Sequence, residues 1–183
     1  MTKQHTHRVA LLWLAAIAVA VFLVDQLAKW LVVSHLTEGV VVPVIGSFLQ
    51  LEFVRNPGAA FSLASGMTWI LTALAAGVVV AIIWAAPRIQ SVAWAVMFGL
   101  LLGGVLGNLT DRLLREPGFG RGYVIDFISM PWMLPAIWNV ADMSILAAMG
   151  TFLVLTLRGV KLDGTVVREG SAPAEPSASA QHD

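Results

Sequence analysis

Four long apolar stretches constrain this chain more than any other feature, because each is long enough for a helix that crosses a lipid bilayer. They are residues 9–31, 67–86, 91–113 and 135–157. About 20 mainly apolar residues are needed to cross the hydrocarbon core. Charged residues make up 12% of the chain, whereas soluble domains carry about 25%. The sequence therefore predicts an all-α membrane protein with four transmembrane helices.

The connections between these stretches differ in length and composition. The second and third stretches are separated only by residues 87–90, which predicts a tight turn between antiparallel neighbours. Segments 34–66 and 115–134 are longer and richer in Gly, Pro and polar residues. Because the chain crosses four times, both termini lie on one side and the two longer segments meet on the other. Within the first of them, residues 40–53 alternate around a Gly-Ser pair, which predicts a small hairpin-like β element.

The third stretch carries small residues at intervals of four, which allow a neighbouring helix to approach closely. They are Ala95, Gly99, Gly103 and Gly107. We expect this ridge to be a packing surface.

The first stretch has some features of a secretory signal sequence. Lys3 and Arg8 precede the apolar run, and Ala18-Val19-Ala20 has the small residues of a cleavage site. The apolar run nevertheless continues to Val24 and resumes after Lys29, which is long for a signal sequence. We therefore expect this segment to be retained as a helix.

Domain organisation and orientation follow from the same pattern. Residues 1–162 are expected to form a single membrane domain, and residues 163–183, rich in Ser, Ala, Pro and Gly, a disordered tail. Positive residues near the spans are slightly more frequent on the side of the termini, which favours cytoplasmic termini. The longer segments, including the β element, would then be extracytoplasmic.

Composition excludes several kinds of chemistry. The chain has no cysteine, which removes disulfides, thiolate zinc sites and cysteine nucleophiles. None of its four histidines stands in a His-Glu-x-x-His arrangement, so a zinc peptidase is not expected. Lys plus Arg equals Asp plus Glu, at 11 each, so there is no basic excess for nucleic acid. We expect neither a metal nor a cofactor.

Ionisable and amide side chains in or near the membrane all map to the side of the two longer segments. They are Asp25, Lys29, Asn56, Asn108, Asp111, Arg112, Asp126, Asn139 and Asp142. A charge inside the hydrocarbon costs at least ~2.5 kcal/mol. Several of these residues are three or four apart, so they share a helix face. We expect them to converge on one polar site in one leaflet.

Individual residues allow more than one interpretation. Asp25 and Lys29 form either a structural ion pair, with Lys29 extending toward the interface, or part of the chemistry. Asp111 is expected to be a structural charge, and Arg112 either faces a substrate or holds helices together. Asp142 has no basic residue within reach on its own helix, which favours a functional role.

Two carboxylates in a low-dielectric pocket are a known solution for peptide hydrolysis. They cannot both ionise easily, so the pair shares one proton. The ionised member takes a proton from water, and the protonated member polarises the scissile carbonyl. Asp126 and Asp142 are the pair that the topology allows to meet. Two other classes stay open from the residues alone, a small ion-coupled transporter and a non-catalytic assembly factor.

Five segments of the sequence resemble, in order, the five sequence boxes of bacterial lipoprotein signal peptidases (signal peptidase II). They are Val24-Asp25-Gln26-x-x-Lys29, Arg55-Asn56-Pro57-Gly58-Ala59-Ala60-Phe61-Ser62, Gly104-x-x-Gly107-Asn108-Leu109-x-Asp111-Arg112, Val124-Ile125-Asp126-Phe127 and Trp138-Asn139-Val140-Ala141-Asp142. The resemblance covers residues 9–157. Trp138, where the family commonly has Phe, and Pro57 are minor departures.

This resemblance implies an aspartyl endopeptidase of the cytoplasmic (inner) membrane. Such enzymes remove the signal peptide of prolipoproteins just before a diacylglyceryl-modified cysteine, at the outer face, and the cyclic peptide globomycin inhibits them. The catalytic pair falls on Asp126 and Asp142. The remaining matches are substrate-binding positions and supporting positions. The substrate-binding ones are Asn56, Asn108, Arg112 and Asn139, and the supporting ones are Asp25, Lys29, Asp111 and Gly58.

Overall fold

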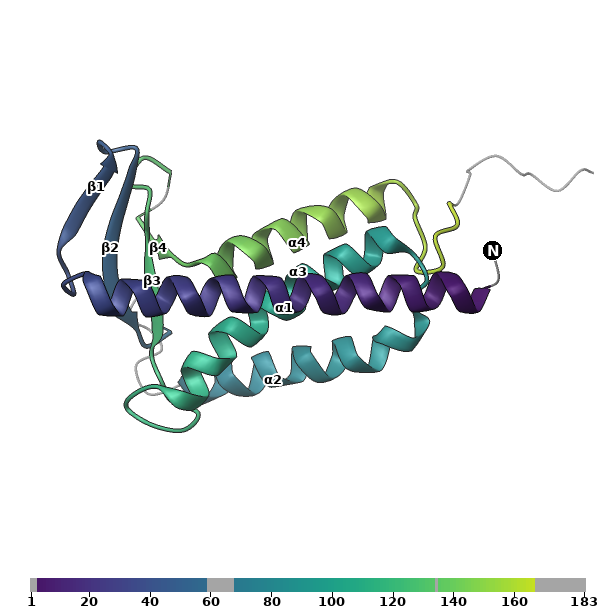
Figure 1. The fold of residues 1–183 in the computed structure, drawn as a ribbon, viewed down its shortest axis with the longest axis horizontal. Coiled ribbons are helices and arrows are strands. Elements are labelled where there is room, and N and C mark those ends of the chain that lie inside the picture. Colours follow the sequence, from purple (N-terminus) through teal and green to yellow (C-terminus); the bar gives the residue numbers. More distant parts are fainter. Residues whose placement is uncertain (1–2, 59–67, 134, 167–183) are drawn as a thin grey trace, which may run out of the picture.

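A computed structural model describes residues 3–58, 68–133 and 135–166. Its long helices are α1 (Lys3–His35), α2 (Thr68–Ala85), α3 (Val92–Leu114) and α4 (Val140–Leu157). All four are long and apolar enough to cross a membrane. They form an elongated bundle with a small sheet at one end and the N-terminus at the other (Figure 1). The predicted fold class is confirmed.

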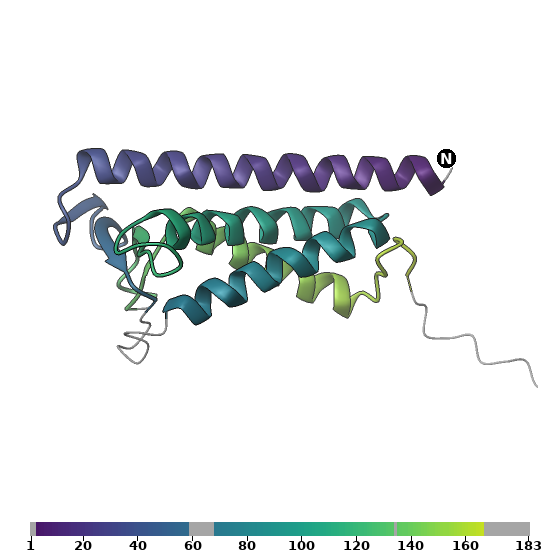
Figure 2. The same ribbon diagram turned by 90° about the horizontal axis from the view of Figure 1, so that it is seen from below.

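Helix α3 is the centre of the bundle, because it contacts each of the other three helices. Figure 2 shows α1 on one side of α3, with α2 and α4 on the other. The predicted ridge of small residues faces α1. A Cβ atom at Gly103 would lie 2.7 Å from the carbonyl oxygen of Ala18, and one at Gly107 would lie 2.5 Å from Asp25 Oδ2. Close packing of α1 on α3 therefore requires glycine at these positions.

The predicted β element is part of a larger antiparallel sheet with the order β1-β2-β3-β4. The hairpin strands are β1 (Val41–Ile45) and β2 (Leu49–Asn56). The second long segment and the residues after it add β3 (Val124–Ser129) and β4 (Ile137–Trp138). Asp126 on β3 pairs with Val54 on β2. Pairing across the two segments thus brings Asn56 and Asp126 to the same end of the sheet.

A small apolar core joins the sheet to the end of α1. Its buried members are Val32, Phe53, Ile125 and Phe127. This core holds β3 against the helices, which gives Asp126 a defined place relative to α1.

Helix α4 begins at Val140, five residues later than the expected start at residue 135. Ile137 and Trp138 are extended instead, since they pair with Ser129 and Ile128 of β3. Asn139 is the N-cap: its side chain accepts from the backbone N–H of Asp142, and the Asp142 carboxylate accepts from the backbone N–H of Asn139. This capping box stabilises the helix start. Asp142 therefore lies in the first turn of α4, not two turns inside it.

At the opposite end of the bundle the chain folds back after α4. The short 3-10 helix η1 (Ala86–Arg88) follows α2, as the expected tight turn requires. The carbonyl oxygen of Leu162 accepts from the backbone N–H groups of Gln90 and Ser91, and Val160 bridges to Val166. Residues 163–166, expected in the disordered tail, are thus part of an ordered turn. The rest of that tail, 167–183, lies outside the described residues.

Candidate active site

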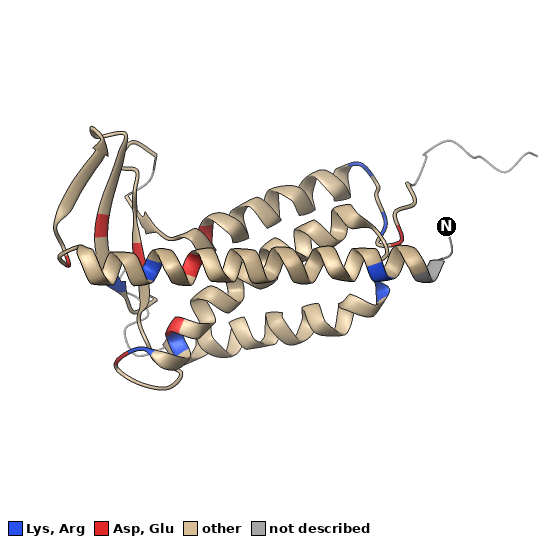
Figure 3. Ribbon diagram, viewed as in Figure 1, with Lys and Arg blue, Asp and Glu red and all other residues tan. Residues whose placement is uncertain are grey.

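The polar residues singled out from the sequence come together where the helices meet the sheet. Asp25 and Lys29 lie on α1, and Asn108, Asp111 and Arg112 lie near the end of α3. Asn56 ends β2, Asp126 lies in β3, and Asn139 and Asp142 open α4. Figure 3 shows charged residues toward the two ends of the bundle, with most of the helix length between them uncharged. The predicted convergence at one end is confirmed.

Asp126 is buried in the sheet, with 3% of its surface exposed. Its Oδ2 accepts a hydrogen bond from Asn56 Nδ2 at 2.7 Å, and its Oδ1 accepts one from Asn139 Nδ2 at 2.6 Å. Burial raises the pKa of the Asp126 carboxyl to about 7 and the charge of Asp142 adds to this, while the two amide hydrogen bonds oppose it. Asp126 is therefore able to hold a proton near neutral pH.

Asp142 is half-buried at the start of α4. Its Oδ1 accepts from Asn108 Nδ2 at 2.8 Å, and its Oδ2 accepts from the backbone N–H of Asn139 at 3.1 Å. Asn139 thus binds both carboxylates, Asp142 through its main chain and Asp126 through its side chain. This single residue sets the two acids relative to each other.

The Asn56 amide is oriented by its own loop. Its Oδ1 accepts from the backbone N–H of Gly58 at 2.8 Å, so its Nδ2 faces Asp126. Gly58 has a φ of 97°, a conformation that a side chain disfavours. A Cβ atom there would also collide with Leu71 Cδ1. Gly58 therefore allows the turn that aims Asn56 at the carboxylate.

One interpretation of the sequence had Lys29 extending toward the membrane interface. The structure shows that it does not. Its side chain is fully buried, and its Nζ lies 2.8 Å from Asp25 Oδ2 and 2.8 Å from Asp111 Oδ2. Asp111 also accepts from Arg115 Nε at 2.6 Å, and Asp25 accepts from the backbone N–H of Ala141 at 2.9 Å. Two carboxylates from different helices offset the cost of burying the ammonium group.

Arg112 lies next to the two acids without an ion pair of its own among the described residues. Its Nη1 donates to the carbonyl oxygen of Asn108 at 3.2 Å. Its Nε is buried and finds no acceptor in the part of the chain that the structure describes. Arg112 therefore retains unused donors beside the site.

A cavity of about 820 Å³ opens over the two acids. Asp126, Asp142 and Asn56 line this cavity. Among the described residues, Asn108, Arg112 and Asn139 are close to the two acids but do not line the cavity. The rest of the wall comes mainly from β2, the chain before α4, and one apolar face of α4. Those residues are Val54, Arg55, Pro57, Pro135, Ala136, Ile137, Trp138, Ile145, Leu146 and Met149. The wall thus places mainly apolar side chains next to two carboxyl groups.

The part of the wall on α4 was not predicted from the sequence. Ile145, Leu146 and Met149 follow Asp142 at intervals of three, four and seven residues, so they share its helix face. That spacing was a usable signal.

Comparisons with known proteins agree with one another. A sequence profile described as "Signal peptidase (SPase) II" matches residues 17–158. A protein of Leifsonia xyli named "Lipoprotein signal peptidase" is 60% identical over 163 residues, 89% of this chain and 75% of its own. A protein of the same name from Rhodococcus jostii is 46% identical, over 87% of this chain and 79% of its own. A solved structure described as a bacterial membrane enzyme superposes with a TM-score of 0.71 at 27% identity, covering 86% of this chain and 92% of that one.

Proposed function

Because this chain belongs to the signal peptidase II family, we propose that it is an aspartyl endopeptidase in which Asp126 and Asp142 activate water. It removes the signal peptide of prolipoproteins just before a diacylglyceryl-modified cysteine. The observation that supports this most directly is that both carboxyl groups line one cavity and are bridged by Asn139.

The proposed reaction divides one proton between two acids. Asp126, with a pKa raised to about 7, carries the proton and donates a hydrogen bond to the scissile carbonyl oxygen. Asp142 accepts a proton from the attacking water, whose oxygen bonds to the carbonyl carbon. The tetrahedral intermediate collapses when the leaving nitrogen takes up the proton that Asp142 accepted from water and the carbon–nitrogen bond breaks. The amides of Asn56 and Asn108 hold the two carboxyl groups in place through these steps.

The cavity wall suits a lipidated substrate. Leu146 and Met149 on α4 are apolar and half or more exposed, so they are the part of the wall that lipid would cover. The acyl chains of the substrate stay in the bilayer while the peptide reaches the carboxylates from the side. Globomycin would occupy the same cavity, and membrane lipid is the surrounding partner.

The site is assigned to the outer face of the cytoplasmic membrane, with cytoplasmic termini. The excess of positive residues on the terminal side supports this orientation. In the described structure, Arg112 is half-buried and its Nη1 donates to the Asn108 carbonyl oxygen, so its charge counts less as a topological signal on the sheet side.

The experiment is a cleavage assay with purified protein in detergent. Two versions of one prolipoprotein are compared, with and without the diacylglyceryl group on cysteine, and cleavage is read as a mobility shift. We expect cleavage of the lipidated version alone, and none by Asp142→Asn. Asp163→Asn is the matched control, because Asp163 is an exposed acid in the turn that follows α4. Cleavage by Asp142→Asn at the normal rate would rule out the two-acid mechanism.

A further inference from the structure

Lys29 makes a third polar contact that charge balance does not require. Besides the two carboxylates, its Nζ donates to Asn108 Oδ1 at 3.0 Å, and the whole side chain is buried. Asp25 and Asp111 already offset its charge. An ammonium group has three N–H donors and no acceptor. All three donors of Lys29 are thus in use, one of them on a neutral amide beside the candidate active site.

This contact helps to decide which way the Asn108 amide faces. Asn108 Oδ1 accepts from Lys29 Nζ and also from Asn139 Nδ2 at 3.1 Å, which leaves Asn108 Nδ2 to donate to Asp142 Oδ1 at 2.8 Å. A reversed amide would set its nitrogen against two donors and its oxygen against a carboxylate. Both contacts would be repulsive, so the reversed amide is disfavoured.

The other two amides of the site are oriented differently. The oxygen of Asn56 is held by the backbone N–H of Gly58, and the oxygen of Asn139 by the backbone N–H of Asp142. Main-chain donors are present whatever the side chain. Of these three amide oxygens, only that of Asn108 is held by side chains, those of Lys29 and Asn139. Its orientation can therefore be changed by substituting one of these two residues.

We propose that Lys29 is a positioning residue of the reaction: it fixes the Asn108 amide so that its N–H always faces Asp142. The ion pairs with Asp25 and Asp111 anchor the ammonium group, and the third donor sets the polarity of the amide. Asp142 is thereby presented with a donor on each of its oxygens and is ready to accept the proton of water. This inference rests on the proposed two-acid function.

The test compares two variants in each of which Asp111 keeps a cationic partner. Asp25→Asn keeps Lys29 on Asn108, since Asp111 still holds the ammonium group. Asp25→Asn with Lys29→Met removes the donor together with one acid, while Asp111 keeps Arg115 as its partner. We expect kcat per folded molecule to fall by about 10- to 100-fold between these two proteins, which corresponds to one lost buried hydrogen bond. KM should change little.

A double-mutant cycle separates positioning from simple support. In an Asn108→Ala background, Lys29→Met with Asp25→Asn should cause no further loss of kcat relative to Asp25→Asn, because the amide that Lys29 orients is gone. A purely structural lysine would lower the folded fraction, measured by thermal unfolding in detergent, and leave kcat per folded molecule unchanged. Losses that multiply in this background, or an unchanged kcat without Lys29, would overturn the inference.

A second variant keeps the test decisive if the methionine protein does not fold. Asp25→Asn with Lys29→Gln restores an uncharged N–H donor next to Asn108, and its kcat should recover toward that of Asp25→Asn. A folded glutamine protein as inactive as Asn108→Ala would contradict the inference. Failure of the two-acid function is recognised separately, because it requires Asp126→Asn or Asp142→Asn to cleave normally.

Discussion

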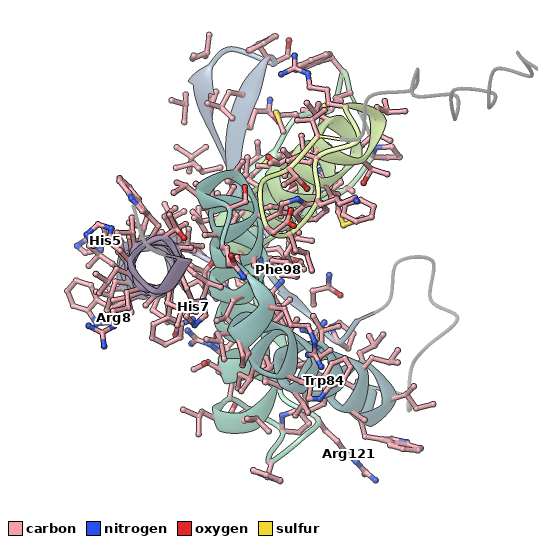
Figure 4. All side chains as sticks on the ribbon, turned by 90° about the vertical axis from the view of Figure 1, so that its right-hand side faces the viewer. His5, His7, Arg8, Trp84, Phe98 and Arg121 are labelled. Atoms are coloured by element: carbon pink, nitrogen blue, oxygen red, sulfur yellow. The ribbon has the colours of Figure 1, made fainter. Side chains whose placement is uncertain are left out.

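The two ends of the bundle are built from the same helices but held together by different interactions. At the end with the sheet, α1, α3 and α4 are joined by buried ion pairs and amide hydrogen bonds around Lys29 and Asn139. Toward the other end they meet in an apolar core whose largest members include Trp94 and Met97. Polar contacts described there include Trp94 Nε1, which donates to the carbonyl oxygen of Val160. His7 points toward the bundle and binds the carbonyl oxygen of Ile89, while His5 and Arg8 point away (Figure 4).

This difference separates stability from reactivity. Lipid provides no hydrophobic driving force between helices, so the apolar end relies on close packing along α3. The polar end carries charges that are costly in a membrane unless they are paired. Residues there contact the two acids as well as joining the helices. Substitutions at the two ends should therefore impair different properties of the protein, its turnover or its stability.

The largest expected effect is loss of turnover without loss of the fold. Asp126→Asn and Asp142→Asn should each lower kcat by at least about a thousandfold, because each removes half of the proposed shared-proton pair. The double variant should be no slower than either single one, since one mechanism is lost once. Thermal unfolding in detergent should stay close to that of the unchanged protein. Near-normal turnover by either single variant would refute the pair.

Asp111 should show the opposite pattern. Asp111→Asn leaves Lys29 with one carboxylate and removes the carboxylate that Arg115 binds, which should cost about 3–5 kcal/mol of stability. The measurement is thermal unfolding, with turnover expressed per folded molecule. Normal stability combined with complete loss of turnover would place Asp111 in the reaction instead.

Asn56 tests whether an amide in the cavity wall contacts the substrate as well as Asp126. Asn56→Ala should cost about 1–3 kcal/mol of transition-state stabilisation, the penalty of an unpaired buried polar group. It should weaken globomycin binding in parallel. Asn108→Ala, which lies behind the wall, should lower turnover with a smaller effect on inhibitor affinity. Equal inhibitor affinity in the unchanged protein and both variants would remove the substrate-binding assignment of Asn56.

The pH dependence of cleavage should report Asp126. Because its pKa is raised to about 7, the required proton is lost above that pH, and the rate should fall about tenfold per pH unit there. Between the ordinary value of 3.8 and about 7, the folded protein binds a proton that the unfolded chain has lost. The contribution of Asp126 to stability therefore decreases as pH rises through that range. A rate that is constant from pH 6 to pH 9 would contradict the assignment of the proton to Asp126.

The smallest effect expected is at the glycines of the apolar half. Gly103→Ala inserts a methyl group 2.7 Å from the Ala18 carbonyl oxygen and should destabilise the protein by about 1–3 kcal/mol. Gly150→Ala is the matched control, since a Cβ atom there meets no described heavy atom within 4 Å. Turnover per folded molecule should be unchanged in both. Equal stability of the two variants would show that α1 does not pack closely on α3.

Local sequence patterns predicted much of this molecule. Span length and composition predicted the four helices. Inside lipid the backbone must satisfy its own hydrogen bonds, and a helix does so within one segment. The spacing of small residues at every fourth position predicted that this ridge of α3 is a packing surface. The start of α4 was missed because residues 135–138 are as apolar as the helix after them, and only their pairing with β3 keeps them extended. The site roles of the nine polar residues remain predictions for the experiments above.

By itself the sequence determined that the chain crosses a membrane and that its polar residues gather at one end. Those properties follow from the order of residues along the chain, through helix length and periodicity. Tertiary structure alone decided how Lys29 is buried and which way each amide faces. Lys29 and Asn108 are 79 residues apart, and Asn56 and Asp126 are 70 apart. Their contacts depend on how α1 packs on α3 and how β2 pairs with β3, and no local pattern encodes which donor meets which oxygen.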